Sequence, residues 1–343
     1  MTSGQPAELT ALAALSARIG ADIELVQAAG GNTSIKIDDV LWVKASGMWL
    51  ADAERKPIFV SVDLPAVRAA MAAGNDKIPA GASGPTGLRP SIETSLHAFM
   101  PHRVVLHVHA VNTIAWAARA DAPPELEKRL AGLAWTWLPY CRPGLPLTLA
   151  VAAATAGRRP DVLVLGNHGL VVGGPDCDAA EALMHDVERR LTLAARAAPP
   201  ADLARLDALC RNKVYRPAAF DECHAVANDP QSRAVATGGT LYPDHVVFLG
   251  PGARALDDDE MIDAVARHSP SAFLLVPGAG TVLRTDLPSG AEPLLRCLGL
   301  VAARLPSGVD VVYLSAHEEL ALANWDAEHY RKSMGSGPQV RLV

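Results

Sequence analysis

The chain lacks several features that define common protein classes. Its 343 residues include five cysteines at irregular spacings and no CxxC pair, which argues against a disulfide framework or a thiolate zinc knuckle. Positive charge is not in excess, because the formal net charge is -6, and we expect neither nucleic acid nor a membrane as a partner. The N-terminal segment has no basic residues ahead of its apolar ones, which is not typical of a signal peptide and predicts a cytoplasmic protein.

Long uninterrupted hydrophobic runs are also missing. The apolar stretch over residues 131–154 contains Pro139, Arg142, Pro143 and Pro146, so we expect no membrane span there. Half of the residues are hydrophobic and only 20% are charged, a balance typical of a folded globular protein.

Helix-like and strand-like segments alternate along the chain, which predicts an α/β fold. The pattern restarts after residue 200, so we expect a body over 1–200 and a smaller C-terminal α/β unit over 201–343. No internal repeat is apparent. In the second unit we expect strands at His245–Leu249, Phe273–Val276, Thr281–Arg284 and Val309–Leu314, and helices at Ala291–Leu305 and Ala323–Ser333.

Three histidines form the most informative pattern. His107 and His109 lie in an expected strand over residues 103–110, where side chains two residues apart point to the same face. His168 lies in a glycine-flanked turn directly after a buried strand. Zinc binds imidazole nitrogen, and a catalytic zinc site uses three protein ligands and keeps one position open. The pattern therefore predicts a site for zinc or another divalent metal.

Glu93 lies at the expected start of a helix for which Ser91 is the expected N-cap. Its carboxylate could ligate the metal at rest and act as an acid/base catalyst when substrate displaces it, or it could be a plain helix-start residue. We expect His97, one turn later on the same face, to pack beside the site. The other histidines expected at the surface are His102, His185, His224 and His268.

Five motifs, in this order, resemble those of the class II aldolase/adducin superfamily, typified by L-fuculose-1-phosphate and L-rhamnulose-1-phosphate aldolases. They are Gly30-Gly31-Asn32-Thr33-Ser34, Val43-Lys44-Ala45-Ser46-Gly47, Arg89-Pro90-Ser91-Ile92-Glu93, His107-Val108-His109-Ala110 and Gly166-Asn167-His168-Gly169-Leu170. Two later segments, 242–246 and 325–328, more weakly resemble the aldolase half of longer proteins that carry a short-chain dehydrogenase.

The resemblance implies a three-layer α/β/α body and a zinc-dependent lyase that forms homotetramers and acts on a small anionic substrate. The implied reaction is retro-aldol cleavage of a hydroxy-ketone, sugar acid or sugar phosphate through a metal-bound enediolate, with Glu93 as acid/base. The implied zinc ligands are His107, His109 and His168, with Glu93 as the resting ligand. The residues implied to hold the substrate's phosphate or carboxylate are Asn32, Ser46, Gly47 and Ser91.

Several alternatives stay open at this point. A decarboxylase could use the same site, and an adducin-like binding module shares the fold but is expected to lack the ligand set. Ile92 stands where the sugar-phosphate aldolases usually have a second hydroxyl, which makes a carboxylate handle as plausible as a phosphate. Lys44 either compensates with its charge or is a solvated strand lysine. The pattern assigns no role to Tyr242, His245 or Tyr330.

Overall fold

The computed structural model describes residues 6–76, 87–211, 213–256, 262–268 and 271–334. The chain divides into two compact units. Unit 1 comprises residues 1–113 and 123–191, and unit 2 comprises residues 114–122 and 192–343. Among the described residues, no helix is long and apolar enough to cross a membrane.

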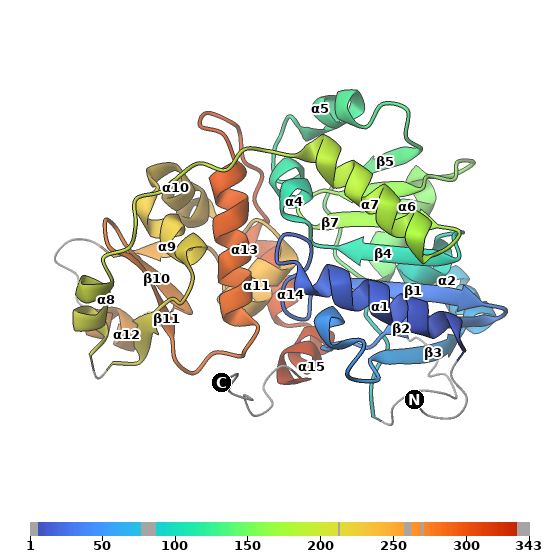
Figure 1. The fold of residues 1–343 in the computed structure, drawn as a ribbon, viewed down its shortest axis with the longest axis horizontal. Coiled ribbons are helices and arrows are strands. Elements are labelled where there is room, and N and C mark those ends of the chain that lie inside the picture. The colour runs from blue at the N-terminus through green and yellow to red at the C-terminus, as the bar shows by residue number, and fades with distance from the viewer. Residues whose placement is uncertain (1–5, 77–86, 212, 257–261, 269–270, 335–343) are drawn as a thin grey trace. The chain divides into compact units, whose positions relative to one another are not determined.

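Unit 1 is built on a seven-stranded sheet with the order β3-β2-β1-β4-β7-β6-β5 (Figure 1). All neighbouring strands are antiparallel except β5 and β6, which are parallel. The strands are β1 (Asn32–Ile37), β2 (Val40–Lys44), β3 (Phe59–Asp63), β4 (Val104–Val108), β5 (Trp135–Leu138), β6 (Val162–Leu165) and β7 (Gly169–Gly174).

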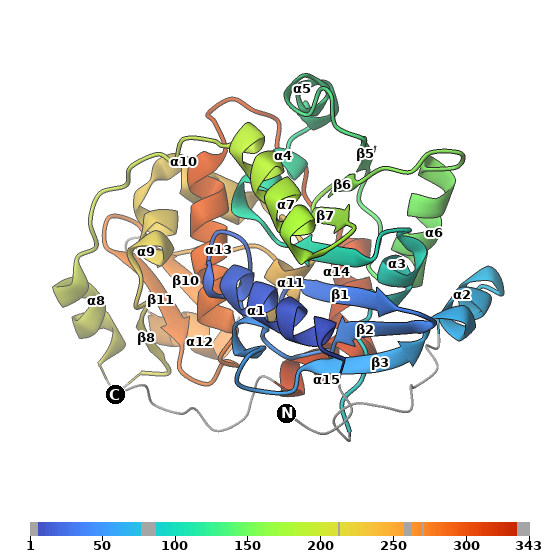
Figure 2. The same cartoon turned by 45° about the vertical axis from the view of Figure 1, so that its right-hand side comes forward.

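Helices cover both faces of this sheet, as Figures 1 and 2 show. On one face lie α1 and α7, whose buried residues recur every three or four positions, as in Leu12, Leu15 and Ile19 of α1. On the other face α3 and α6 pack against the sheet through side chains such as Leu96 and Val151. The helices of this unit are α1 (Glu8–Ala21), η1 (Leu50–Asp52), α2 (Leu64–Ala72), α3 (Thr94–Phe99), α5 (Ala122–Arg129), α6 (Leu145–Ala154) and α7 (Cys177–Leu191). Helix α4 (Val111–Ala117) begins in unit 1 and continues into unit 2 after residue 113. The α/β prediction is confirmed.

Unit 2 contains a four-stranded sheet with the order β8-β11-β10-β9. Its strands are β8 (Tyr215–Pro217), β9 (Arg254–Ala255), β10 (Phe273–Val276) and β11 (Gly280–Arg284). Its helices are α8 (Leu203–Cys210), α9 (Asp221–Asn228), α10 (Pro230–Gly238), α11 (Pro243–Leu249), α12 (Ile262–His268), α13 (Ala291–Arg304), α14 (Ala316–Ala323) and α15 (Asp326–Met334).

Two strand predictions in unit 2 are wrong. His245–Leu249 belongs to helix α11, which has Pro243 in its first turn. Every residue of α11 is buried, so the helix lacks the exposed polar face that would have identified it in the sequence. Val309–Leu314 forms only an isolated bridge from Val311 to Arg119. The terminal helix expected at 323–333 is present as α15, which begins at Asp326, and a separate helix, α14, precedes it.

Unit 2 repeats the strand order of half the unit 1 sheet, although no repeat is apparent in the sequence. The series β4-β7-β6-β5 and β8-β11-β10-β9 have the same directions, antiparallel, antiparallel and parallel. The hairpins β6–β7 and β10–β11 also share their turn, in which Asn167 and Gly278 have φ values of 50° and 73°. In each hairpin the residue just before the second strand closes the turn with its backbone N–H, from His168 to Leu165 and from Ala279 to Val276.

Candidate metal centre

The middle of the unit 1 sheet positions the first two histidines. His107 is on β4, where it pairs with Asn32 of β1 on one side and Val171 of β7 on the other, and its side chain is fully buried. His109 follows one residue beyond the end of β4 and is also buried. The alternation of side chains along the strand brings both imidazoles to the same side, as the sequence predicts.

His168 reaches the same place from the turn between β6 and β7. The neighbouring backbone is close, because a Cβ atom on Gly169 would lie 2.6 Å from the carbonyl oxygen of Val108. Gly31 has the same constraint, since its Cβ would lie 2.7 Å from the carbonyl oxygen of His107 and its φ is +58°. Both glycines of the sequence motifs are therefore required by close approach to β4.

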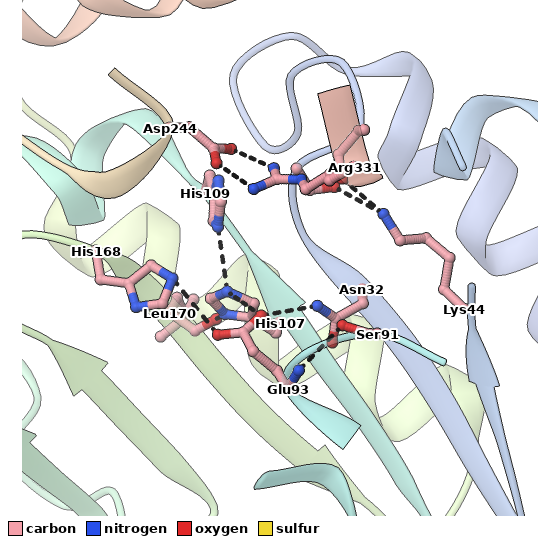
Figure 3. Close-up of polar contacts among 12 residues, drawn as sticks. Asn32, Lys44, Ser91, Glu93, His107, His109, His168, Leu170, Asp244 and Arg331 are labelled. Carbon is pink, nitrogen blue, oxygen red and sulfur yellow. Dashed lines mark hydrogen bonds and ion pairs between the residues drawn. The ribbon is translucent and has the colours of Figure 1, made fainter. Parts of the chain in front are cut away.

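The three imidazoles face one another (Figure 3). Nε2 of His107 and Nε2 of His109 are 3.1 Å apart, and the ring of His168 has its centroid 4.9 Å from that of His107. One ring nitrogen from each of the three histidines lies within 4.8 Å of the others. Among the described residues, this is the group of three His, Cys, Asp or Glu side chains whose spacing could hold one ion.

Glu93 completes the group from the start of α3. Its Oε2 is 3.3 Å from Nε2 of His107, and its Oε1 is 3.5 Å from Nε2 of His168. Glu93 itself occupies the N-cap position of α3, so the prediction that Ser91 is the N-cap is wrong. The hydroxyl oxygen of Ser91 instead accepts a hydrogen bond of 3.2 Å from the backbone N–H of Glu93 and fixes the turn before the helix.

The spacing of these donors suits a tetrahedral ion. Ligand atoms about 2.05 Å from a tetrahedral zinc are roughly 3.3 Å from one another, and the three donor distances given above range from 3.1 to 3.5 Å. His107 is also in the appropriate tautomer, because its Nδ1 must donate its proton to the carbonyl oxygen of Leu170 at 3.0 Å, which leaves Nε2 with a lone pair. The residues present therefore fit a divalent metal.

Electrostatics keep Glu93 ionised. Burial alone would raise its pKa, but in the metal-free chain protonated His107 and His168 and the hydrogen bond from Asn32 together lower the pKa of Glu93 to about 2. The Asn32 side-chain amide donates to Oε2 of Glu93 at 2.8 Å. An ionised carboxylate beside three imidazole nitrogens is a set of donors that a divalent cation favours.

Of the four residues predicted to hold the substrate's anionic group, Asn32 begins β1, and Ser46, Gly47 and Ser91 lie on two loops whose backbones are adjacent. Ser46 donates its backbone N–H to the carbonyl oxygen of Arg89, and Ser91 donates its own to that of Lys44. Lys44 is buried, not solvated as one alternative had it, and its ammonium donates to the backbone carbonyl oxygens of Ala29, Gly30 and Met48. Asn32, Ser46 and Ser91 are buried, and Gly47 adopts a positive φ of 79°.

The remaining histidines divide into different environments. His97 is fully buried, with Nδ1 2.7 Å from the Ser34 hydroxyl, and burial lowers the pKa of His97 to about 3. His224 is buried as well, where its Nδ1 accepts the backbone N–H of Thr281, so its predicted surface position is wrong. His185 is exposed as predicted, His102 is partly buried against Asp161, and the side chain of His268 lies outside the described residues.

Sequence reasoning missed two residues that support the site. Gln27 donates its side-chain amide to the carbonyl oxygen of His109 at 3.2 Å, and Glu188 of α7 accepts hydrogen bonds from the segment that follows His109. Neither belongs to a motif. The sequence could have pointed to Glu188 in one way, because it is an acidic residue on the otherwise apolar face of an amphipathic helix.

Among its described residues, unit 2 has no equivalent of the three histidines. The third residue of β7 pairs with His107, whereas the third residue of β11 pairs with Pro217. The same alignment of strands and hairpins gives the counterparts of His107, His109 and His168 as Pro217, Ala219 and Ala279. Within the repeated architecture, the candidate metal centre thus lies in unit 1.

Comparison with known proteins identifies the family of the chain. Residues 10–195, more than half of the chain, match the model of the Class II Aldolase and Adducin N-terminal domain. The chain belongs to this family. The resemblance predicted from the sequence motifs is therefore confirmed, and class II aldolases are metal-dependent.

Individual relatives match only part of the chain. The chain is 31% identical over a 178-residue alignment to "Uncharacterized oxidoreductase YuxG" of Bacillus subtilis (strain 168), and the match covers 46% of this chain and 25% of that protein. The match to part of a longer protein named as an oxidoreductase agrees with the weaker resemblance to aldolase halves of longer proteins.

Solved structures similar to the chain carry class II aldolase names. The N-terminal class II aldolase domain of a conserved protein from Thermoplasma acidophilum is 27% identical, with 56% of this chain and 95% of that one covered and a TM-score of 0.46. L-fuculose-1-phosphate aldolase from Thermus thermophilus is 19% identical, with 54% and 92% covered and a TM-score of 0.39.

In unit 2, the two later motifs meet. Arg331 of α15 makes two hydrogen bonds to the carboxylate of Asp244 on α11, at 2.6 and 2.8 Å, and all three of Asp244, Glu328 and Arg331 are buried. Tyr242 and His245 are buried too, with ring centroids 5.8 Å apart. This ion pair attaches the terminal helix to α11.

Proposed function

We propose that the chain is a zinc-dependent class II aldolase that cleaves a carbon–carbon bond of a small anionic hydroxy-carbonyl substrate. The observation that carries this proposal is the convergence of His107, His109, His168 and Glu93 at distances close to the edges of a tetrahedral coordination shell. Three neutral imidazoles and one carboxylate suit zinc, although other divalent ions accept the same donors.

A divalent ion bound by these residues supplies Lewis-acid chemistry, because it polarises a substrate carbonyl and stabilises the negative charge left by bond cleavage. Glu93 is the group that moves the proton, since its carboxylate lies beside the three imidazoles and is ionised. Asn32 holds Oε2 of Glu93 and so determines which carboxylate oxygen is available for that transfer. Burial of Glu93 limits competing proton exchange with water.

Two alternatives remain to be tested. A decarboxylase would need the same stabilisation of negative charge, but it would release CO2 instead of an aldehyde. An adducin-like binding module would not need the four metal-ligating residues. The presence of these residues here favours catalysis. The substrate's anionic handle is proposed to lie at Asn32, Ser46, Gly47 and Ser91. The loops of Ser46 and Ser91 are adjacent, and Lys44 donates a hydrogen bond to Ala29 in the segment before Asn32.

Assembly and location are also proposals. We expect a homotetramer, as the family resemblance implies, and we retain the expectation of a cytoplasmic location. Light scattering coupled to size-exclusion chromatography at micromolar concentration would measure the assembly, and a fully active monomer would contradict it.

Metal content and a paired substrate screen would test the function. Purified protein should hold about one zinc or similar ion per chain by elemental analysis. The His107→Ala/His109→Ala double variant should hold none at this site, and normal loading in that variant would refute the assignment. The zinc-loaded enzyme should then release an aldehyde from a hydroxy-ketone, sugar-acid or sugar-phosphate substrate. Release of CO2 alone would favour the decarboxylase.

A further inference from the structure

A buried carboxylate on α7 contacts the segment that follows the second histidine. The side chain of Glu188 accepts a hydrogen bond of 3.3 Å from the Asn112 amide and another from the Thr113 hydroxyl. Asn112 and Thr113 are themselves buried and are the third and fourth residues after His109. All four residues belong to unit 1.

Glu188 is the one charged residue among the buried positions of α7. The other buried positions of α7 carry no charged group; they are Cys177, Ala180, Met184, Val187 and Leu191. Burial raises the pKa of Glu188 to about 7, despite the hydrogen bonds from Thr113 and Asn112 that lower it. Burying an acid opposes folding unless its hydrogen bonds offset the desolvation. An apolar residue at this position would avoid the cost of burying an acid. The hydrogen bonds that Glu188 accepts therefore indicate that it positions the segment that follows His109.

That segment needs support other than the sheet. The last pair between β4 and β7 joins Val108 to Leu170, so His109 lies outside the ladder. Its carbonyl oxygen accepts from Gln27, whose amide also donates to the carbonyl oxygen of Ile23 at 2.7 Å. Two residues after His109, the backbone N–H of Val111 donates to the carbonyl oxygen of Glu24 at 2.8 Å. Glu188 holds the next two residues.

Building on the proposed metal centre, we propose that Glu188 is a positioning residue for His109. By fixing Asn112 and Thr113 against α7, it holds the backbone from which His109 extends, so that Nε2 stays 3.1 Å from that of His107. Glu188 acts on His109 through this segment, by accepting the hydrogen bonds of Asn112 and Thr113. Outer partners that orient metal ligands typically change metal affinity by about 10–100-fold, and we expect the lower part of this range.

Metal affinity of the purified full-length chain tests this role directly. Zinc dissociation constants would be measured by competition with a chromogenic chelator for wild type, Glu188→Ala, Glu188→Gln and Thr113→Val. Met184→Ala is the matched control, because it removes a buried side chain one turn away on α7 and leaves these hydrogen bonds in place. Visible absorption of the cobalt-substituted proteins would report the coordination geometry independently of activity.

We expect Glu188→Ala to weaken zinc binding about tenfold and to alter the cobalt spectrum. Thr113→Val should give a smaller effect in the same direction, and Glu188→Gln should restore most of the affinity because its amide oxygen still accepts from Thr113. Equal affinity and spectra in wild type and Glu188→Ala would overturn this inference alone. An equal loss in Met184→Ala would also overturn it, since the effect would then be general destabilisation. A wild-type chain that binds no zinc would remove the proposed function and this inference together.

Discussion

Asn32 and Glu93 are 61 positions apart in the chain, yet the Asn32 amide donates a 2.8 Å hydrogen bond to Oε2 of Glu93. Asn32 is the first residue of β1 and pairs in register with His107 of β4, so the same backbone contact places the amide beside a proposed metal ligand. The Oδ1 atom of Asn32 accepts no hydrogen bond from the described residues. Asn32 therefore orients the proposed acid/base group, in addition to any contact with substrate.

Replacement of Asn32 tests that relationship. We expect Asn32→Ala to lower kcat about tenfold or more, because a hydrogen bond to a charged group contributes roughly 1.5–3 kcal/mol. Metal content should persist, since the histidines are unchanged. Asn32→Asp should lower kcat further, because it places a second carboxylate beside Glu93. Steady-state kinetics with elemental analysis would measure both, and an unaltered kcat in Asn32→Ala would exclude the orienting role.

Glu93→Gln keeps the shape of the side chain but removes the group that accepts a proton. Turnover should fall by roughly 10²–10⁴-fold, the usual contribution of a general acid/base. Three imidazoles should retain most of the metal. Glu127→Gln on α5 makes the same chemical change at an exposed position and should have normal turnover. Near-normal activity of Glu93→Gln would mean that another residue transfers the proton.

The sequence predicts the proposed site better than its surroundings, for physical reasons. His107, His109 and His168 converge because strand alternation and a glycine-bounded turn are local rules, and both are legible in the sequence. The hydrogen bonds of Gln27 and Glu188 depend on the packing of elements distant in the chain, so no local pattern reveals them. A motif predicts ligands more readily than the residues that support them.

Predictions of burial and of secondary structure were wrong at positions where the packing of distant elements decides the outcome. Lys44 on β2 resembles a solvated strand lysine, but three backbone carbonyl oxygens accept its hydrogen bonds in the interior. The short apolar run in α11 fits strand and helix equally well, although Pro243 at its start indicates a helix. Pro146, one of the residues that argue against a membrane span, lies in the first turn of α6, where proline is compatible with a helix.

The raised pKa of Glu188 predicts how the free energy of unfolding depends on pH. Its pKa is raised to about 7 by burial, so between pH 4.5 and 7 the folded chain binds more protons at this residue than the unfolded chain. Protonation of Glu188 stabilises the folded chain. This contribution is complete below the pKa of Glu188 in the unfolded chain, about 4.3, and is lost as the pH rises through its pKa in the folded chain, about 7. Glu188→Gln cannot titrate.

The free energy of unfolding of Glu188→Gln, minus that of wild type, should therefore rise from pH 4.5 to 7. The maximum slope is about 1.4 kcal/mol per pH unit. Urea unfolding of the metal-free proteins at several pH values would measure it, and subtraction cancels the titration of all other groups. A difference that stays constant with pH would show that Glu188 has an ordinary pKa in the folded chain.

Ile92 bears on the choice between phosphate and carboxylate as the substrate's handle. It is half-buried between Ser91 and Glu93, where related sugar-phosphate aldolases usually have a hydroxyl. A phosphate has more acceptor oxygens than a carboxylate, so the missing donor should penalise phosphate more. Because a hydrogen bond to a charged group contributes roughly 1.5–3 kcal/mol, Ile92→Ser should raise kcat/KM for a sugar phosphate about tenfold relative to a carboxylate-bearing analogue. Ile92→Ala, which differs from it by one oxygen atom, should leave that ratio near the wild-type value, and Ser46→Ala should weaken both substrates. A wild-type enzyme that already prefers the phosphorylated ketose by orders of magnitude would contradict the argument, and the backbone donors around Gly47 would then be the phosphate's partners.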